Sequence, residues 1–276
     1  MKSPCDLRKL AALILSSFLL FTLVVSATIV PALGQQSPPA PTVPSSGFAG
    51  LDRYRASRIA VFTDDFGQLA RYREANAAMQ MPGPGENLVV FFGDSITDMW
   101  HLDQSFPGKP YVNRGIGGQT TPQMIVRFRQ DVIELHPKVV IILAGTNDIA
   151  GNTGPMRLED IEANYASLAE LARAHDIKLI YSSVLPVHNY TPPSQELFAQ
   201  RSPKKILELN RWLKNYCLSS NAPCLYLDYF SAMVDDRGYM KKDLAEDGLH
   251  PNAAGYKIMA PLAETAIEKA LVAAKP

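Results

Sequence analysis

Short apolar runs alternate along the chain with longer segments in which apolar side chains recur at helical spacing. An uninterrupted apolar run is typical of a strand covered on both faces, whereas helical spacing indicates an amphipathic helix. We predict strands at 88–92, 111–113, 139–143, 179–182 and 225–227. We predict helices at 121–135, 158–172, 203–216 and 251–270. This alternation predicts an α/β domain with a parallel sheet and helices on both faces.

A further helix is predicted before the first strand. Residues 56–79 carry apolar side chains on roughly one side, and Pro-Gly-Pro-Gly at 82–85 ends the pattern. The part at 69–76 is expected to pack on the core as an extra N-terminal helix. The side chains that define the apolar side are Ile59, Phe62, Phe66, Leu69 and Tyr72.

Residues 1–34 have the pattern of a secretory segment. Two basic residues, Arg8 and Lys9, precede a mostly apolar stretch at 10–33, and Ala-Leu-Gly at 32–34 fits a cleavage site. The stretch is also long enough to span a bilayer, so the segment is expected to be either a cleaved signal peptide or a retained membrane anchor. Both alternatives place the rest of the chain outside the cytoplasm, as a secreted, periplasmic or membrane-anchored protein.

The remainder divides into a linker and one domain. Residues 35–49 are rich in Pro and Ser and have no apolar period, which predicts a disordered linker. Residues 50–276 have the ordinary size of a single domain. The 27 basic and 27 acidic residues give a net charge of zero, and no block of Lys and Arg stands out. Nucleic acid is therefore not an expected partner.

Two cysteines, Cys217 and Cys224, lie in the predicted domain. Export and their close spacing favour a disulfide, and the alternative is a pair of small buried or half-buried thiols. Neither lies beside a histidine or in a Cys-x-x-Cys motif, so metal binding and redox catalysis are not expected of them.

Candidate chemistry follows three of the predicted strands. Ser95 follows the first strand, Gly-Ile-Gly-Gly-Gln-Thr at 115–120 follows the second, and Gly-Thr-Asn-Asp at 145–148 follows the third. The carboxyl ends of parallel strands meet at one edge of a sheet, where ligands bind in folds of this class. Asp-Gly-Leu-His at 247–250 opens the last predicted helix. We therefore predict an active site at this edge.

Ser95, His250 and Asp247 are candidates for a nucleophile, its general base and the group that orients the base. A serine hydroxyl needs a base within hydrogen-bond reach. Pro251 favours extended backbone at His250 and starts a helix, whose positive end favours a neutral imidazole. Asp247 can accept a hydrogen bond from Nδ1 of that ring. Taken singly, Ser95 could be a helix N-cap and the Asp–His pair a capping pair; together they indicate acyl transfer.

Donors for an oxyanion are also available. The backbone N–H groups of Ser95 and Gly118 and the side-chain amide of Asn147 would give three of them. The alternative for Asn147 is a loop residue that bonds to its own turn. Gly115 and Gly117 are expected to serve the geometry of the turn rather than the reaction.

These blocks resemble the SGNH (GDSL-type) hydrolase superfamily of esterases, lipases and carbohydrate acetylesterases. The matching blocks are Gly93-Asp94-Ser95, Gly118, Gly145-Thr146-Asn147-Asp148 and Asp247-Gly248-Leu249-His250-Pro251. The resemblance implies a flavodoxin-like three-layer α/β/α sandwich with a five-stranded parallel sheet in the order 2-1-3-4-5. It implies a catalytic triad of Ser95, Asp247 and His250 and an oxyanion hole of Ser95, Gly118 and Asn147. It implies no metal and no organic cofactor.

The expected function is therefore that of an exported serine esterase acting on short-chain carboxylic esters, such as acetyl, aryl or carbohydrate esters. Alternatives are a lysophospholipase or thioesterase of the same superfamily, and a non-catalytic carbohydrate-binding module on the same fold. Asp94, Trp100 and His188 are candidates for lining the substrate pocket. The alternatives are a hydrophobic cluster under a loop for Trp100 and a Pro-stiffened loop for His188.

Overall fold

The structure is a computed structural model that describes residues 44–80, 83, 85–219 and 224–272. The predicted secretory segment, 1–34, and residues 35–43 of the predicted linker lie outside the described residues. No helix of the described ranges combines the length and apolar character needed to cross a membrane.

Five parallel strands form one sheet in the order β2-β1-β3-β4-β5, as the resemblance implied. Gly93, the last residue of β1, is paired with Gly115 of β2 and Leu143 of β3. This register brings the carboxyl ends of the three strands level, so the loops that follow them meet at one edge. The strands are β1 Val89–Gly93, β2 Tyr111–Gly115, β3 Val139–Leu143, β4 Lys178–Ser182 and β5 Cys224–Leu227.

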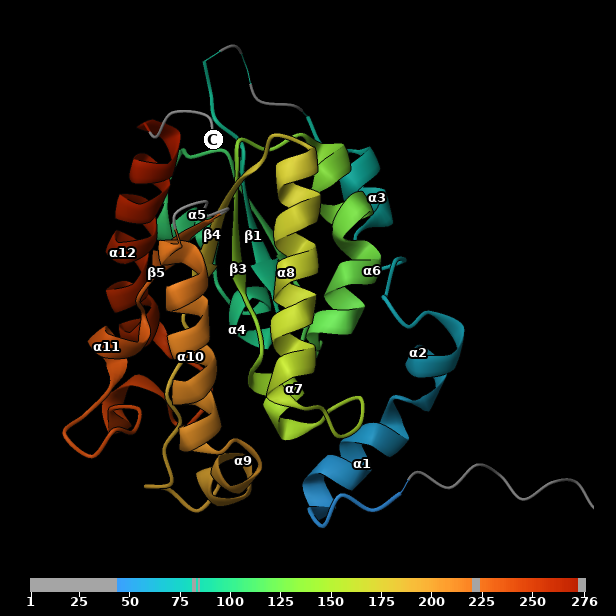
Figure 1. The fold of residues 1–276 in the computed structure, drawn as a ribbon, viewed down its shortest axis with the longest axis vertical. Coiled ribbons are helices and arrows are strands. Elements are labelled where there is room, and N and C mark those ends of the chain that lie inside the picture. The colour runs from blue at the N-terminus through green and yellow to red at the C-terminus, as the bar shows by residue number, and fades with distance from the viewer. Residues whose placement is uncertain (1–43, 81–82, 84, 220–223, 273–276) are drawn as a thin grey trace, which may run out of the picture. The chain divides into compact units, whose positions relative to one another are not determined.

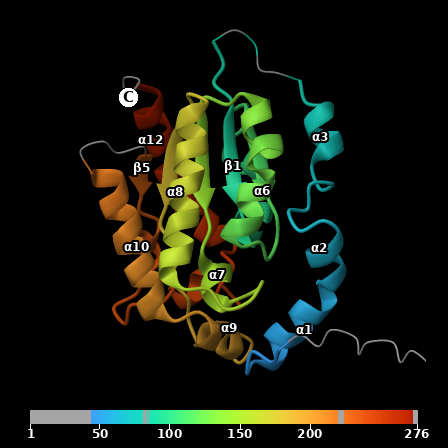
Figure 2. The same ribbon diagram turned by 45° about the vertical axis from the view of Figure 1, so that its right-hand side comes forward.

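Helices cover both faces of the sheet (Figures 1 and 2). Phe92 of β1 faces one layer and packs edge-on against Phe128, within a core built mostly on α6, α8 and α10. The neighbouring Phe91 points to the opposite face, toward Trp100, α12 and the short helices. The helices of the sandwich are α4 Ser95–Asp98, α5 Leu102–Ser105, α6 Thr121–Asp131, η1 Ile133–Leu135, α7 Thr146–Ala150, α8 Leu158–Ala174, α9 Ser194–Gln200, α10 Pro203–Leu218, α11 Phe230–Met233, η2 Lys242–Leu244 and α12 Ala253–Val272.

The single helix predicted over 56–79 is wrong. Three helices occupy this part of the chain: α1 Ala49–Ser57, α2 Ile59–Asp64 and α3 Arg73–Ala77. The carboxylate of Asp65 accepts the backbone N–H groups of Leu69 and Ala70, and Gln68 has a positive φ of 55°. A side chain that binds backbone donors in a turn competes with the helix, which explains the break.

Cys217 at the end of α10 and Cys224 at the start of β5 are joined by a disulfide, with their Cα atoms 5.0 Å apart. Of the two alternatives left open by the sequence, the structure has the disulfide. It ties the last strand of the sheet to the helix that precedes it.

Candidate active site

Ser95 stands at the first position of α4, directly after β1. Asp94 is the N-cap, and its Oδ1 accepts the backbone N–H of Ile96 at 3.0 Å. The preceding Gly93 leaves no room for a side chain, because a Cβ there would lie 2.6 Å from the backbone oxygen of Leu143. The tight turn from strand to helix therefore depends on Gly93 and Asp94, and it presents Ser95 at the carboxyl edge of the sheet.

Ser95, His250 and Asp247 form one hydrogen-bonded chain. Oγ of Ser95 lies 2.8 Å from Nε2 of His250, and Nδ1 of His250 lies 2.6 Å from Oδ2 of Asp247. Because a carboxylate accepts, Nδ1 carries the proton in this pairing and Nε2 is left as an acceptor for the serine hydroxyl. This is the arrangement that a nucleophile, a base and its orienting carboxylate require.

Asp247 is held as a carboxylate by its own loop. Burial raises its pKa, but hydrogen bonds from the His250 ring and from the backbone N–H groups of His250 and Leu249 outweigh burial and hold the pKa well below its ordinary value. The backbone distances are 2.8 Å to His250 and 2.9 Å to Leu249. Gly248 makes this turn possible with a φ of +81°, in the region that favours glycine. The ring of His250 is thus oriented by a permanently charged partner.

Gly118 lies in a turn whose carbonyl groups are anchored. Arg58 donates to the oxygen of Gly117 at 3.4 Å, and a planar trans peptide then directs the N–H of Gly118 to the opposite side. The oxygen of Gly118 itself accepts from Asn152 at 2.9 Å and from the hydroxyl of Tyr54 at 3.2 Å. A side chain at position 118 would collide with that hydroxyl, and the φ of +77° also favours glycine.

Asn147 lies in α7, buried, beside this turn. Its Nδ2 donates to the oxygen of Gln119 at 3.1 Å, and its Oδ1 accepts from Nη2 of Arg201 at 3.1 Å. The amide nitrogen carries two hydrogens, so one remains for a ligand. Asn147, Gly118, Ser95 and His250 all line one cavity of about 410 Å³. The structure therefore brings together all the residues expected for the triad and the oxyanion hole.

The three residues expected to line the substrate pocket do not line this cavity. Asp94 is fully buried as the N-cap of α4. Trp100 stacks on Tyr256 in the core on the face of the sheet opposite α8. This is the hydrophobic cluster that the sequence analysis gave as the alternative for Trp100. His188 is fully buried, and its Nε2 lies 2.6 Å from the backbone oxygen of Ala245. Burial in the core is the physical reason for each correction.

The cavity walls come instead from α1 and from the α9 segment. Leu51 and Tyr54 of α1 lie on one side, and Glu196 of α9 and Arg201, directly after α9, lie on another. The Oε1 of Glu196 accepts the backbone N–H of Gly50 at 2.5 Å, which joins the two walls. No local motif marks these residues, and their positions follow only from the packing of distant segments.

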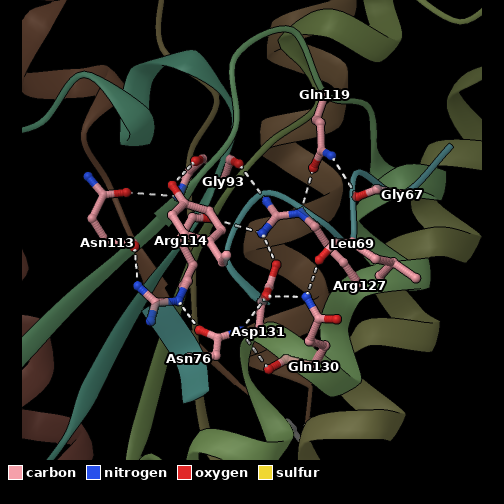
Figure 3. A network of polar contacts seen from close by, with 12 residues as sticks. Gly67, Leu69, Asn76, Gly93, Asn113, Arg114, Gln119, Arg127, Gln130 and Asp131 are labelled. Carbon is pink, nitrogen blue, oxygen red and sulfur yellow. Dashed lines mark hydrogen bonds and ion pairs between the residues drawn. The ribbon is translucent and has the colours of Figure 1, made fainter. Parts of the chain in front are cut away.

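Arg127 of α6 is a further residue that supports the site, and it belongs to none of the sequence motifs described above. Its guanidinium is fully buried and donates to the backbone oxygens of Gly93 at 3.0 Å and Arg114 at 2.9 Å, and to Oε1 of Gln119 at 2.6 Å (Figure 3). Asp131, one helical turn later, accepts at 3.0 Å. Burial lowers the pKa of Arg127 to about 10. This cation ties the end of β1, which carries the nucleophile, to the end of β2 and to the oxyanion turn.

Known proteins share this arrangement of elements. The model of the GDSL-like lipase/acylhydrolase family matches residues 91–258. A GDSL-like lipase from Bacteroides thetaiotaomicron is 39% identical, with a TM-score of 0.68 over 75% of this chain and all of that one. A candidate acylhydrolase from Bacteroides fragilis is also 39% identical, with a TM-score of 0.69 over 75% of this chain and 99% of that one.

A curated relative is similar over a shorter stretch. It is named an uncharacterized lipoprotein, YqeF, of Bacillus subtilis, and it is 39% identical over 124 residues. The match covers 38% of this chain and 51% of the relative, so the chain spans about half the length of that protein.

Proposed function

Because this chain belongs to the GDSL-like lipase/acylhydrolase family, we propose that it is an exported serine esterase that hydrolyses short-chain carboxylic esters. Acetyl esters, aryl esters and acyl groups on carbohydrates are the substrate classes we assign to it. The observation that carries the proposal is the hydrogen-bonded chain from Oγ of Ser95 through His250 to Asp247, with distances of 2.8 and 2.6 Å.

In the first half of the reaction, Oγ of Ser95 attacks the ester carbonyl carbon while its proton passes to Nε2 of His250. The carbonyl oxygen gains a negative charge, which the N–H groups of Ser95 and Gly118 and the amide of Asn147 stabilise. The bond to the leaving alcohol then breaks, and Nε2 gives its proton to the alcohol oxygen. Asp247 stabilises the imidazolium formed in between.

In the second half, water attacks the acyl carbon of the acyl-serine and gives one proton to Nε2 of His250. The bond between the acyl carbon and Oγ breaks, and Oγ of Ser95 takes that proton back. The acid leaves and the hydroxyl is restored. Each half of the reaction uses His250 as the base and the same three oxyanion donors, so both halves depend on the same set of residues.

The size of the cavity supports short acyl groups, because about 410 Å³ is near the lower end of ordinary ligand pockets. Export is supported by the secretory pattern of residues 1–34 and by the disulfide between Cys217 and Cys224, which is typical of oxidising compartments. The lipoprotein name of the Bacillus relative agrees with a location at or beyond the membrane.

The test is hydrolysis of p-nitrophenyl acetate, butyrate, octanoate and palmitate by the full chain and by Ser95→Ala. Rates that fall with acyl length and disappear in Ser95→Ala are expected. Ser167→Ala, on the outer side of α8, is the matched control and should keep full activity. A fluorophosphonate probe should label the parent chain and Ser167→Ala but not Ser95→Ala. Activity that survives in Ser95→Ala would refute the assignment of the nucleophile.

A further inference from the structure

A second cavity, of about 560 Å³, lies beside the cavity that holds Ser95. Its walls include Phe48, Phe62, Ile149 and Met156, so a large part of its lining is apolar. The two cavities have two lining residues in common, Leu51 and Asn152. These two side chains therefore form the partition between the ester pocket and the neighbouring space.

The N-terminal arm, residues 44–64, supplies Leu51 to this partition. It includes α1 and α2, which run along one side of the sandwich and place α1 near α7 and α9 (Figure 2). Arg55 donates from Nε to the backbone oxygen of Gly151 at 3.0 Å, and Gly50 donates to Glu196 at 2.5 Å. Together with the bonds from Tyr54 and Arg58 to the turn at Gly117 and Gly118, these contacts fix the arm over the site. The arm precedes residues 91–258, so it lies outside the residues that the family model matches.

The two shared residues are held in different ways. Asn152 is held at both ends, because its backbone N–H donates to the oxygen of Asn147 at 3.0 Å and its Nδ2 donates to the oxygen of Gly118 at 2.9 Å. Leu51 is only 4% exposed and is held by packing alone. A smaller side chain at position 51 would join the two cavities without disturbing the oxyanion turn.

The chemistry of the reaction restricts where the leaving group can lie. The leaving oxygen must lie within hydrogen-bond reach of Nε2 of His250, which gives it a proton. In our proposal the acyl group extends away from His250, toward the part of the cavity wall that Leu51 and Asn152 form. An apolar space behind this wall suits an aliphatic chain, because burial of each methylene is favourable.

We propose that Leu51 is a specificity-determining residue that limits the length of the acyl chain, and that the second cavity is an acyl-chain subsite closed off by it. The proposal rests on the esterase function proposed above. It assigns to the N-terminal arm a role in substrate choice. It also explains how a site of this kind keeps to short esters although a larger apolar cavity lies next to it.

The experiment compares Leu51→Ala with the parent chain on p-nitrophenyl esters from acetate to octanoate. The ratio of kcat/KM for octanoate to that for acetate is expected to rise by about tenfold or more in Leu51→Ala, while kcat/KM for acetate stays within about threefold. Leu207→Ala, an exposed leucine on α10, is the matched control and should leave the ratio unchanged. Circular dichroism and retained acetate hydrolysis show that Leu51→Ala is folded, and Leu51→Val offers a milder change in the same direction.

A second variant tests the cavity itself. In the double variant Leu51→Ala/Met156→Trp, the indole fills the second cavity and the gain for octanoate should disappear while acetate is still hydrolysed. An unchanged octanoate-to-acetate ratio in an active Leu51→Ala would overturn the inference and leave the proposed function intact. A gain confined to acetyl esters of longer alcohols would also overturn the acyl assignment. Failure of the proposed function is distinct, because it would appear as hydrolysis that survives in Ser95→Ala or as no ester hydrolysis by the parent chain.

Discussion

Nη2 of Arg201 donates a hydrogen bond to Oδ1 of Asn147 at 3.1 Å. The two side chains come from α7 and from the residue after α9, and both are buried beside the proposed oxyanion hole. Burial lowers the pKa of Arg201 only to about 10, so the guanidinium keeps its charge at neutral pH. The charged donor fixes which end of the Asn147 amide is oxygen, and thereby directs Nδ2 toward the ester pocket.

Arg201→Met should therefore lower kcat with a smaller effect on KM. Without Arg201 the amide of Asn147 keeps only the bond to the oxygen of Gln119, so it is held less firmly and would donate to the oxyanion less well. Loss of one such donor costs about 100- to 1000-fold in turnover, which sets the upper limit. Arg201→Lys, which keeps the charge, should recover part of kcat. Arg211→Met, on the exposed side of α10, is the control for removal of a guanidinium. A change confined to KM would show that Arg201 contacts substrate and does not position Asn147.

Asp247→Asn should lower kcat by about 10⁴-fold. An amide at this position can donate to Nδ1 of His250, which would place the ring proton on Nε2 and remove the acceptor for the hydroxyl of Ser95. The side chain keeps its size, and its oxygen can still accept the N–H of Leu249, so the loop should stay folded. Steady-state kinetics with p-nitrophenyl acetate measure the effect. Asp243→Asn, an exposed carboxylate in the same region, should retain activity; an equal loss there would point to a general effect of charge.

The sequence predicts the central strands of the sheet well because they are buried on both faces. The bounds of β3 agree with the prediction at both ends, since Val139 to Leu143 is apolar throughout and fully enclosed. β2 extends past the predicted Asn113 to include Arg114, whose guanidinium lies over the ring of Tyr72 and donates to Asn76 at 2.8 Å. A charged residue inside a strand is stabilised here by partners that only tertiary structure brings to it.

The site residues also fall into a group that the sequence predicts and a group that it does not. Ser95, Gly118, Asn147 and His250 belong to local motifs that follow strands or open a helix, so topology alone places them at one edge. Other contacts join residues far apart in the sequence: 54 residues separate Arg201 from Asn147, 64 separate Tyr54 from Gly118, and 34 separate Arg127 from Gly93. No local sequence pattern predicts them. For Arg127 a weak signal exists, because Arg127 and Asp131 stand four residues apart on the side of α6 that also carries Phe128.

Arg127→Met should destabilise the fold by about 3–5 kcal/mol, because it leaves the buried carboxylate of Asp131 without its ion pair. It also removes the donors that join the oxygen of Gly93 to the oxygen of Arg114. Urea unfolding followed by circular dichroism measures the change in the free energy of unfolding. Arg129→Met, on the exposed side of the same helix, should change it by less than about 0.5 kcal/mol. Equal effects of the two substitutions would contradict the structural role of Arg127.

Asp94 makes the stability of the fold depend on pH. Burial raises its pKa from 3.8 to about 7, and neither the hydrogen bond from Ile96 nor the nearby His250 cancels this effect. In the unfolded chain the carboxyl has its ordinary pKa and releases its proton near pH 3.8. Between these two values the native state holds a proton that the unfolded state has lost, so the free energy of unfolding falls as pH rises through this window. Above about pH 7 both states are ionised and the full destabilisation remains.

Asp94→Asn should remove this dependence. An amide cannot ionise, and its oxygen can still accept the N–H of Ile96, so the N-cap of α4 is kept. The free energy of unfolding of Asp94→Asn, relative to that of the parent chain, should rise from about pH 4 to about pH 7 and then stay level. Burial also raises the pKa of Asp148, to about 6. Both proteins therefore keep the part of the pH dependence of the free energy of unfolding that comes from Asp148. Urea unfolding at a series of pH values measures this difference in the free energy of unfolding. If the free energies of the two proteins ran parallel against pH, Asp94 would be ionised in the native state throughout the range.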